Sequence, residues 1–341
     1  MTPETLASNA NIALYAAMVV FTLAMLAFAG HLAARAPRRT DEYAAERAAE
    51  LAVEPAVRRS AERESLLVGG GGGTEVSAPA PAPPPASESA TSRQRGSIGL
   101  TLTYLGTLLL VASVLMRGLA VSRPPWGNMF EFATAAVAAV AVTFSLLARR
   151  NRWEWLGVFI VGPILLVLGL SLTVLYTEAG QLMPALRSYW LGIHVSVAFI
   201  AVALFTIACA IGVLYLVRLR REQSPPAKPN FIESLPSSAK LEQTAYGLNM
   251  VGFILWTFTV IAGAIWAKEA WGAYWQWDPK EVWSFVIWTV YAAYMHGRAT
   301  AGMDLRKSTY IALAGYVAVI LNFTLVNLAS TFAGMHNYSG M

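Results

Sequence analysis

The residues best suited to chemistry are concentrated in one segment, Trp271 to Trp283, which reads W-G-A-Y-W-Q-W-D-P-K-E-V-W. It holds four tryptophans and two carboxylates within thirteen positions. An indole has a broad apolar face and one N–H donor, so it suits membrane interfaces and large flat partners. An interfacial aromatic belt explains one or two tryptophans at a helix end, but it explains four of them poorly. The cluster instead favours a surface for a planar hydrophobic molecule such as haem. The candidate catalytic residues are Trp271, Gly272, Trp275, Trp277, Asp278 and Trp283.

The two carboxylates of this segment also have a structural interpretation. Asp278, Pro279 and Glu281 stand where an N-cap, the first helical position and the third helical position would fall. This order predicts a capping box at the start of a helix. Helix capping and a role at the aromatic surface therefore both remain open for Asp278 and Glu281.

Four histidines are the other candidates, and neutral imidazole is a common axial ligand of haem iron. His194 begins one apolar segment and His336 follows another, both at the end that carries the tryptophans. His31 and His296 end apolar segments at the opposite end. The sequence thus predicts two histidine pairs, one at each face of a membrane. A packed or interfacial histidine is the alternative for each, and it weighs most for His31.

The composition requires a lipid environment for these residues. The chain is 56% hydrophobic and 13% charged, with a mean hydropathy of +0.50 over 341 residues. These values are typical of polytopic membrane proteins. We predict an all-α bundle of about eight transmembrane helices, because about 20 apolar residues span a bilayer core. The apolar runs are 11–33, 98–119, 129–148, 155–176, 191–217, 247–267, 282–297 and 309–332.

The basic residues predict the orientation of this bundle. If the tryptophan segment is outside, alternation places both termini outside and the connections 35–97, 149–152, 218–240 and 298–307 inside. These connections hold 20 of the 25 Lys and Arg residues, as the positive-inside rule requires. The pI of about 9.3 is then an orientation signal and gives no support for nucleic-acid binding. We expect a multi-pass protein of the cytoplasmic membrane whose site faces the extracytoplasmic side and whose surface contacts lipid.

Three regions follow from the composition along the chain. Residues 1–35 form a first transmembrane helix, which lacks a basic leader and a cleavage site and is expected to be retained. Residues 36–97 contain charged, glycine-rich and proline-rich stretches, which predict a flexible cytoplasmic linker with a short charged helix at its start. Residues 98–341 form a seven-helix membrane domain with an external tryptophan-rich loop at 268–281. Cys209 is the sole cysteine, so an intrachain disulfide is excluded and a packing role is favoured.

Several segments carry a resemblance to a known family. The stretch Trp271 to Trp283 resembles the tryptophan-rich signature of the haem-handling CcsA/ResC-type cytochrome c biogenesis proteins. Residues 189–195 and 326–338 are similar to the family's two external-histidine segments. Residues 126–131 (W-G-N-M-F-E) are similar to its Asn-hydrophobic-aromatic-Glu segment. The resemblance runs from about Ile98 to the C-terminus and includes Asn128 and Glu131 as candidate cofactor-binding residues, although a helix-entry role explains both equally well.

The resemblance implies a membrane conduit and synthase for haem b. Haem would enter from the inner side and be held at the external surface while an apocytochrome c presents Cys-x-x-Cys-His. Thioether bonds would then form, as in a holocytochrome c synthase. The implied iron ligands are His194 and His336 outside and the embedded His296, whose own partner is His31, a residue of another helix or a residue of the partner subunit. The implied partners are a CcsB/ResB-type membrane subunit, apocytochrome c and a thioredoxin-like pathway that keeps the substrate thiols reduced.

Two other functions remain compatible with the residues. A haem exporter or carrier without ligation activity would use the same surface. A transmembrane di-haem electron carrier would use the two histidine pairs, but it leaves the tryptophan segment without a purpose. Outer cations could pair with haem propionates or anchor the chain at the interface, and the sequence does not choose between these roles or among Arg117, Arg123, Arg187, Lys268 and Lys280.

Overall fold

The structure is a computed structural model that describes residues 2–66, 90–178, 188–224, 231–300 and 302–328, with the backbone alone for 36–66, 325, 327 and 328. It is all-α, as predicted. Two short 3-10 helices, η1 (Glu154–Leu156) and η3 (Phe231–Ser234), accompany eight α-helices. These are α1 (Pro3–Leu66), α2 (Ala90–Ala120), α3 (Met129–Asn151), α4 (Gly157–Val174), α5 (Tyr189–Gln223), α6 (Ser238–Trp271), α7 (Pro279–Thr300) and α8 (Leu305–Leu328).

The helices agree with the apolar runs in number and position. Six segments in the described part of the chain are long and apolar enough to cross a membrane: Pro3–Arg35, Ala90–Ala120, Met129–Asn151, Glu154–Val174, Tyr189–Gln223 and Ser238–Trp271. Helices α7 and α8 hold the last two predicted runs, but they are not among these six. The structure therefore gives eight helices and six candidate spans.

The first helix continues well past residue 35, where the first predicted region ends. Helix α1 has 64 residues and ends at Leu66, and α2 begins at Ala90. The added part, residues 36–66, is rich in alanine, glutamate and arginine, which have high helix propensity. The charged helix expected at the start of the linker thus joins the apolar helix without a break, and residues 67–89 lie outside the described part.

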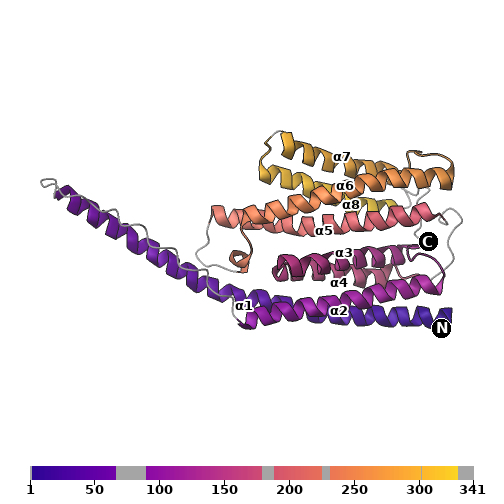
Figure 1. Ribbon diagram of the computed structural model, residues 1–341, viewed down its shortest axis with the longest axis horizontal. Helices are drawn as coiled ribbons and strands as arrows, with labels where there is room; N and C mark the ends of the chain where they lie inside the picture. The colour runs from indigo at the N-terminus through magenta and orange to yellow at the C-terminus, as the bar shows by residue number, and fades with distance from the viewer. Residues whose placement is uncertain (1, 67–89, 179–187, 225–230, 301, 329–341) are drawn as a thin grey trace.

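The eight helices form two layers that meet along α3 and α5 (Figure 1). One layer contains α1 to α4, with α1 packed along α2. The other contains α5 to α8, with α5 packed along α6 and α7 along α8. The start of α1 and the end of α8 lie at the same end of the bundle as the connection from α6 to α7, which carries Trp275 and Trp277. This arrangement is the one that alternation of eight helices predicts.

Phenylalanines of α1 fit against glycines of its neighbours and fix the first layer. Phe21 and Phe28 are both fully buried. An added Cβ would lie 2.7 Å from the Phe28 ring at Gly99 in α2, and 3.0 Å from the Phe21 ring at Gly106. Gly157 at the start of α4 also contacts Phe28 closely. Small residues allow helix backbones to approach in a membrane, so α1 is an integral part of this layer.

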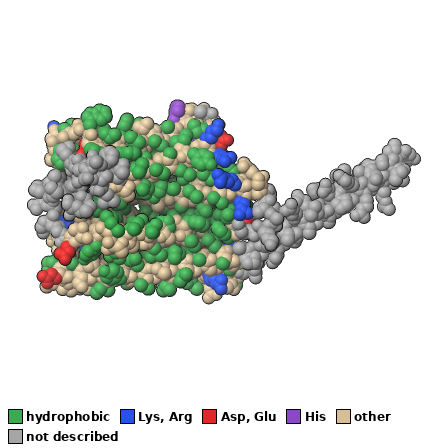
Figure 2. Space-filling view, turned by 180° about the vertical axis from the view of Figure 1, so that it is seen from behind, with side chains coloured by type: hydrophobic (Ala, Val, Ile, Leu, Met, Phe, Trp, Pro, Cys, Tyr) green, Lys and Arg blue, Asp and Glu red, His purple; other side chains and the backbone are tan. Residues whose placement is uncertain are grey.

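Charged side chains are distributed unequally over the surface. Figure 2 shows Lys and Arg side chains gathered at the end of the bundle from which the long grey segment projects, with a broad hydrophobic face between the ends. Helices α3 and α5 end there in basic turns, at Arg149 and Arg150 and at Arg220 and Arg221. The described basic clusters thus lie opposite the tryptophan segment.

Candidate functional site

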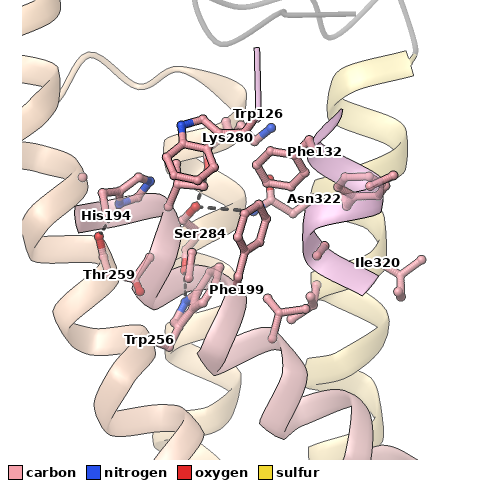
Figure 3. Close-up of a pocket in the computed structure, with 18 of the residues that line it drawn as sticks. Trp126, Phe132, His194, Phe199, Trp256, Thr259, Lys280, Ser284, Ile320 and Asn322 are labelled. Carbon is pink, nitrogen blue, oxygen red and sulfur yellow. Dashed lines mark hydrogen bonds between the residues drawn. The ribbon is translucent and has the colours of Figure 1, made fainter. Parts of the chain in front are cut away.

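An apolar pocket of about 310 Å³ opens between the two layers, near the tryptophan end. Its size is at the lower end of the range for small-molecule sites. Helices α3 to α8 all contribute to its walls. Figure 3 shows side chains from α3, α5, α6, α7 and α8 converging on it. The aromatic lining residues are Trp126, Phe132, Phe199, Trp256, Trp266, Tyr274, Trp275, Tyr316 and Phe323.

His194 lines this pocket from the first turns of α5 and is held in a defined orientation. Its Nδ1 lies 2.8 Å from the carbonyl oxygen of Thr259 in α6. A carbonyl only accepts, so Nδ1 carries a proton, and in the neutral imidazole the lone pair is then on Nε2. The imidazole also stacks on the indole of Trp266, with 6.3 Å between centroids and 12° between planes. Histidines that bind a metal through one ring nitrogen usually donate the N–H of the other to an acceptor of this kind.

The four tryptophans of the segment 271–283 occupy different environments. Trp275 lines the pocket, and Trp271 packs edge-on against Trp266 with centroids 4.6 Å apart. Trp277 is 77% exposed and contacts Trp275 in a T-shaped arrangement at 5.8 Å. Trp283 packs against the core between α5 and α8. Of these four, Trp275 is thus the one that faces the pocket directly.

Two residues in the turn between α6 and α7 have a positive φ. Gly272 follows α6 as its C-cap with φ of 83°, and its N–H donates to the Lys268 carbonyl at 3.0 Å. Glycine suits this left-handed position because it has no Cβ. Trp277 has φ of 61°, which is uncommon for a bulky residue. Strain at such positions is often found at functional sites.

The predicted capping box at the start of α7 is confirmed. The Asp278 carboxylate accepts from the Lys280 N–H at 3.0 Å. The Glu281 carboxylate accepts from the N–H groups of Asp278 at 3.2 Å and Gln276 at 2.8 Å. Asp278 is buried and Glu281 lines the pocket. Both carboxylates therefore shape the tryptophan turn.

Asn128 and Glu131 also form a helix start, that of α3. The Asn128 side chain accepts from the Glu131 N–H at 2.9 Å, and Glu131 accepts from the Gly127 N–H at 2.9 Å. Glu131 is completely buried and pairs with Arg117 at 3.0 Å and with Arg123 at 2.6 Å. Asn128 lines the pocket and Glu131 is not among its lining residues. The helix-entry interpretation thus accounts for the observed contacts of both side chains.

The structure separates the two inner histidines. His31 is buried on α1, and its Nδ1 lies 2.7 Å from the carbonyl oxygen and 3.1 Å from the hydroxyl of Ser92 in α2. His296 is exposed on α7, and α1 and α7 occupy opposite edges of the bundle (Figure 1). These two residues are therefore not brought together as an inner pair. His336 lies outside the described residues, so its pairing with His194 stays a prediction.

Several pocket residues were not among the predicted site residues. Thr259 and Trp266, which orient His194, lie inside α6 and near its end, where nothing in the apolar pattern distinguishes them. Trp126 was noted only in the resemblance; its buried Nε1 has no hydrogen-bond partner among the described residues. Lys280 was one of five candidate cations, and its place in the pocket depends on how α7 packs.

Fold and site together define an all-α membrane protein with an oriented imidazole and several indoles around an apolar pocket at one end of the bundle. The chain belongs to the cytochrome c assembly protein family, which it matches over residues 98–333. It is therefore a multi-pass membrane protein of cytochrome c biogenesis.

Curated relatives carry the resemblance through most of the chain. The cytochrome c biogenesis protein CcsA of Chlamydomonas reinhardtii is 32% identical over 240 residues, covering 68% of this chain and 65% of the relative. CcsA of Guillardia theta is 33% identical, covering 63% and 76%. CcsA of Synechococcus sp. (strain CC9605) is 30% identical, covering 73% and 88%. The resemblance to the CcsA/ResC type is confirmed, and this chain spans slightly less than two thirds of the Chlamydomonas relative.

A solved structure has a similar fold. The cytochrome c heme lyase CcmF superposes on this chain with a TM-score of 0.59 at 14% sequence identity. The match covers 95% of this chain and 47% of CcmF, so this chain spans about half of that protein. At this identity the similarity concerns the fold alone.

Proposed function

We propose that this chain binds haem b as its substrate in the pocket at His194 and presents it for covalent attachment to apocytochrome c. The thiols of a Cys-x-x-Cys-His segment would add across the two haem vinyl groups, each sulfur bonding to one vinyl carbon and each thiol proton passing to the other. This addition is balanced without an oxidant. The chain would be the haem-presenting component of a holocytochrome c synthase.

The orientation of His194 is the observation that carries this proposal. Its Nδ1–H is held by the Thr259 carbonyl, and the unprotonated Nε2 belongs to a ring that lines an apolar pocket. Iron takes its axial ligand from such a nitrogen. The aromatic walls supply the apolar surface that a macrocycle requires. The residues present therefore fit haem, and His336 is proposed as the second external ligand.

The exposure of His296 bears on the proposed partners. A histidine exposed on an outer helix of a membrane bundle is costly in lipid unless another group covers it. Because His31 is on the opposite edge, the proposed second ligand of an inner haem comes from another chain. We assign this role to a CcsB/ResB-type membrane subunit, with haem entering from the basic cytoplasmic end and leaving from the extracytoplasmic tryptophan end. A thioredoxin-like pathway would keep the apocytochrome thiols reduced.

Coexpression with a reporter apocytochrome tests the proposed reaction. The host would lack its own assembly system and would express the chain with its CcsB/ResB-type partner. Haem that stays on the reporter after denaturation supports ligation. Haem bound to this chain with none on the reporter would instead support the exporter or carrier.

Replacement of the proposed ligand tests the binding site itself. We expect His194→Gly to change the haem absorption spectrum of the purified protein and to reduce reporter maturation. Added imidazole should restore both, because the vacated space can admit a free ligand. An unchanged spectrum and full maturation without imidazole would contradict the assignment. A di-haem electron carrier is disfavoured by the separation of His31 from His296.

A further inference from the structure

Lys280 occupies a distinctive position in the pocket wall. Among the described residues that line the pocket, it is the one cationic side chain and Glu281 is the one carboxylate. Its Nζ lies 5.7 Å from the ring centroid of Phe132, across the pocket mouth on α3. Figure 3 shows its side chain beside Trp126 and Phe132.

The local environment lowers the pKa of Lys280 from the ordinary value of a lysine. Burial lowers the pKa of Lys280 to about 8, against the opposing effect of the Asp278 carboxylate. Asp278 and Glu281 are already engaged with backbone N–H groups of the tryptophan turn. An anion in the pocket would favour the charged form of the lysine.

The other outer cations that the structure describes have different tasks. Arg117 and Arg123 bind the buried carboxylate of Glu131, and their side chains are 6% and 7% exposed. Lys268 donates to the carbonyl of Gly272 at 2.7 Å and so completes the end of α6. These contacts hold the three cations outside the pocket wall, to which none of them contributes.

The backbone beneath Lys280 is fixed by hydrogen bonds. Its N–H donates to Asp278 at 3.0 Å, and its carbonyl accepts from the Ser284 hydroxyl at 2.7 Å. Trp256 Nε1 donates to the Ser284 carbonyl at 3.2 Å, and the Asn322 amide lies 3.4 Å from the Ser284 hydroxyl. Side chains of α6 and α8 thus hold the start of α7, which places Lys280 in the pocket wall.

We infer that Lys280 is the carboxylate-binding residue of this pocket and pairs with a propionate of the bound porphyrin. The inference rests on the proposed haem-binding function and deepens it. His194 would bind the metal at the ring centre while Lys280 binds a carboxylate at the ring edge. Two anchors of different chemistry fix a flat molecule against rotation in its own plane. Lys280 is thus a positioning residue, which determines which ring edge the vinyl groups present.

The test compares haem b with its dimethyl ester, in which both propionates are blocked. The full chain in detergent would be titrated with each, and the dissociation constants would be taken from the absorption change. We expect the native protein to bind haem b about tenfold or more tightly than the ester, the loss that corresponds to one charge-assisted hydrogen bond. Lys280→Met should weaken the binding of haem b by that factor and leave the affinity for the ester unchanged.

Two further variants sharpen the result. Lys280→Arg keeps the charge and should keep most of the preference for haem b. Lys268→Met removes a cation from the same end of the bundle but outside the pocket wall, and the preference should persist. Equal binding of haem b and its ester by the native protein would overturn the role of Lys280 and leave the haem site intact. Failure to bind either would instead refute the proposed function.

Discussion

The orientation of His194 depends on a residue with no side chain. An added Cβ at Gly263 in α6 would lie 2.7 Å from Cε1 and 2.9 Å from Nδ1 of this imidazole. Real Cβ atoms essentially never approach so closely, so Gly263→Ala should displace the ring from the Thr259 carbonyl. We expect about a 10- to 100-fold loss of haem affinity, the usual effect of disturbing the support of a metal ligand. A Soret titration of the purified variant would measure it.

Gly247→Ala is the matched control for this substitution. It lies on the same helix, and its added Cβ would meet nothing within 4 Å. Its haem affinity should equal that of the native protein. If both alanine variants bind haem with native affinity and spectrum, His194 does not need the observed orientation.

The pKa of Lys280 predicts how haem binding depends on pH. Because burial lowers this pKa to about 8, the lysine of the free protein is charged below pH 8 and becomes neutral above it. A bound propionate favours the charged form, so affinity for haem b should be highest below pH 8 and fall by up to tenfold per pH unit above it. The fall should end at the higher pKa of the complex. Titrations from pH 7 to pH 10 would measure this.

The dimethyl ester and Lys280→Met provide the comparison for the pH series. The native protein with the ester lacks the propionate, and Lys280→Met with haem b lacks the lysine. In both cases the fall in affinity above pH 8 should disappear. The same pH profile for haem b and its ester would assign the titration to another group.

Local signals in the sequence were sufficient for some of the site residues. The order of Asp278, Pro279 and Glu281 predicts a capping box because its hydrogen bonds join residues within one turn. Trp266 and Lys280 could not be assigned in this way. Their contacts with His194 and Phe132 join helices far apart in the chain, and hydropathy does not specify which face of one helix meets another.

At the scale of elements, contacts between phenylalanines and glycines explain how α1 is held. Gly99→Val would place its Cβ 2.7 Å from the fully buried Phe28 ring. Overpacking of this kind typically costs about 1–3 kcal/mol. We therefore expect a lower midpoint of thermal unfolding in detergent, measured by circular dichroism. Gly169→Val in α4, where an added Cβ would meet nothing within 4 Å, should keep a midpoint near that of the native protein.

The existence of the helices was more predictable than their ends. Every apolar run of the sequence overlaps one α-helix, because a chain in lipid must satisfy its backbone hydrogen bonds within each segment. The end of α1 was not predictable from hydropathy. Residues 36–66 continue the helix to Leu66. Their alanine, glutamate and arginine side chains have high helix propensity although they are not predominantly apolar.

At the scale of the whole molecule, the charge distribution predicts an orientation. The start of α1 and the end of α8 lie at the tryptophan end (Figure 1), and Lys and Arg gather at the other end (Figure 2). The positive-inside rule then places the tryptophan end outside the cell. Since Cys209 is the only cysteine, a Cys209→Ala background allows single cysteines to report this orientation.

We expect exposed positions at the two ends to react differently with a membrane-impermeant maleimide. In that background, Glu178→Cys lies beyond α4 at the tryptophan end, and Gln223→Cys lies at the last residue of α5 at the basic end. Both positions are exposed on the protein. A difference in labelling therefore reports which side of the membrane each position faces. On spheroplasts Glu178→Cys should be labelled, and Gln223→Cys should be labelled only after the membrane is permeabilised. The reverse pattern would place the His194 pocket at the cytoplasmic face, where it would have no access to an extracytoplasmic apocytochrome.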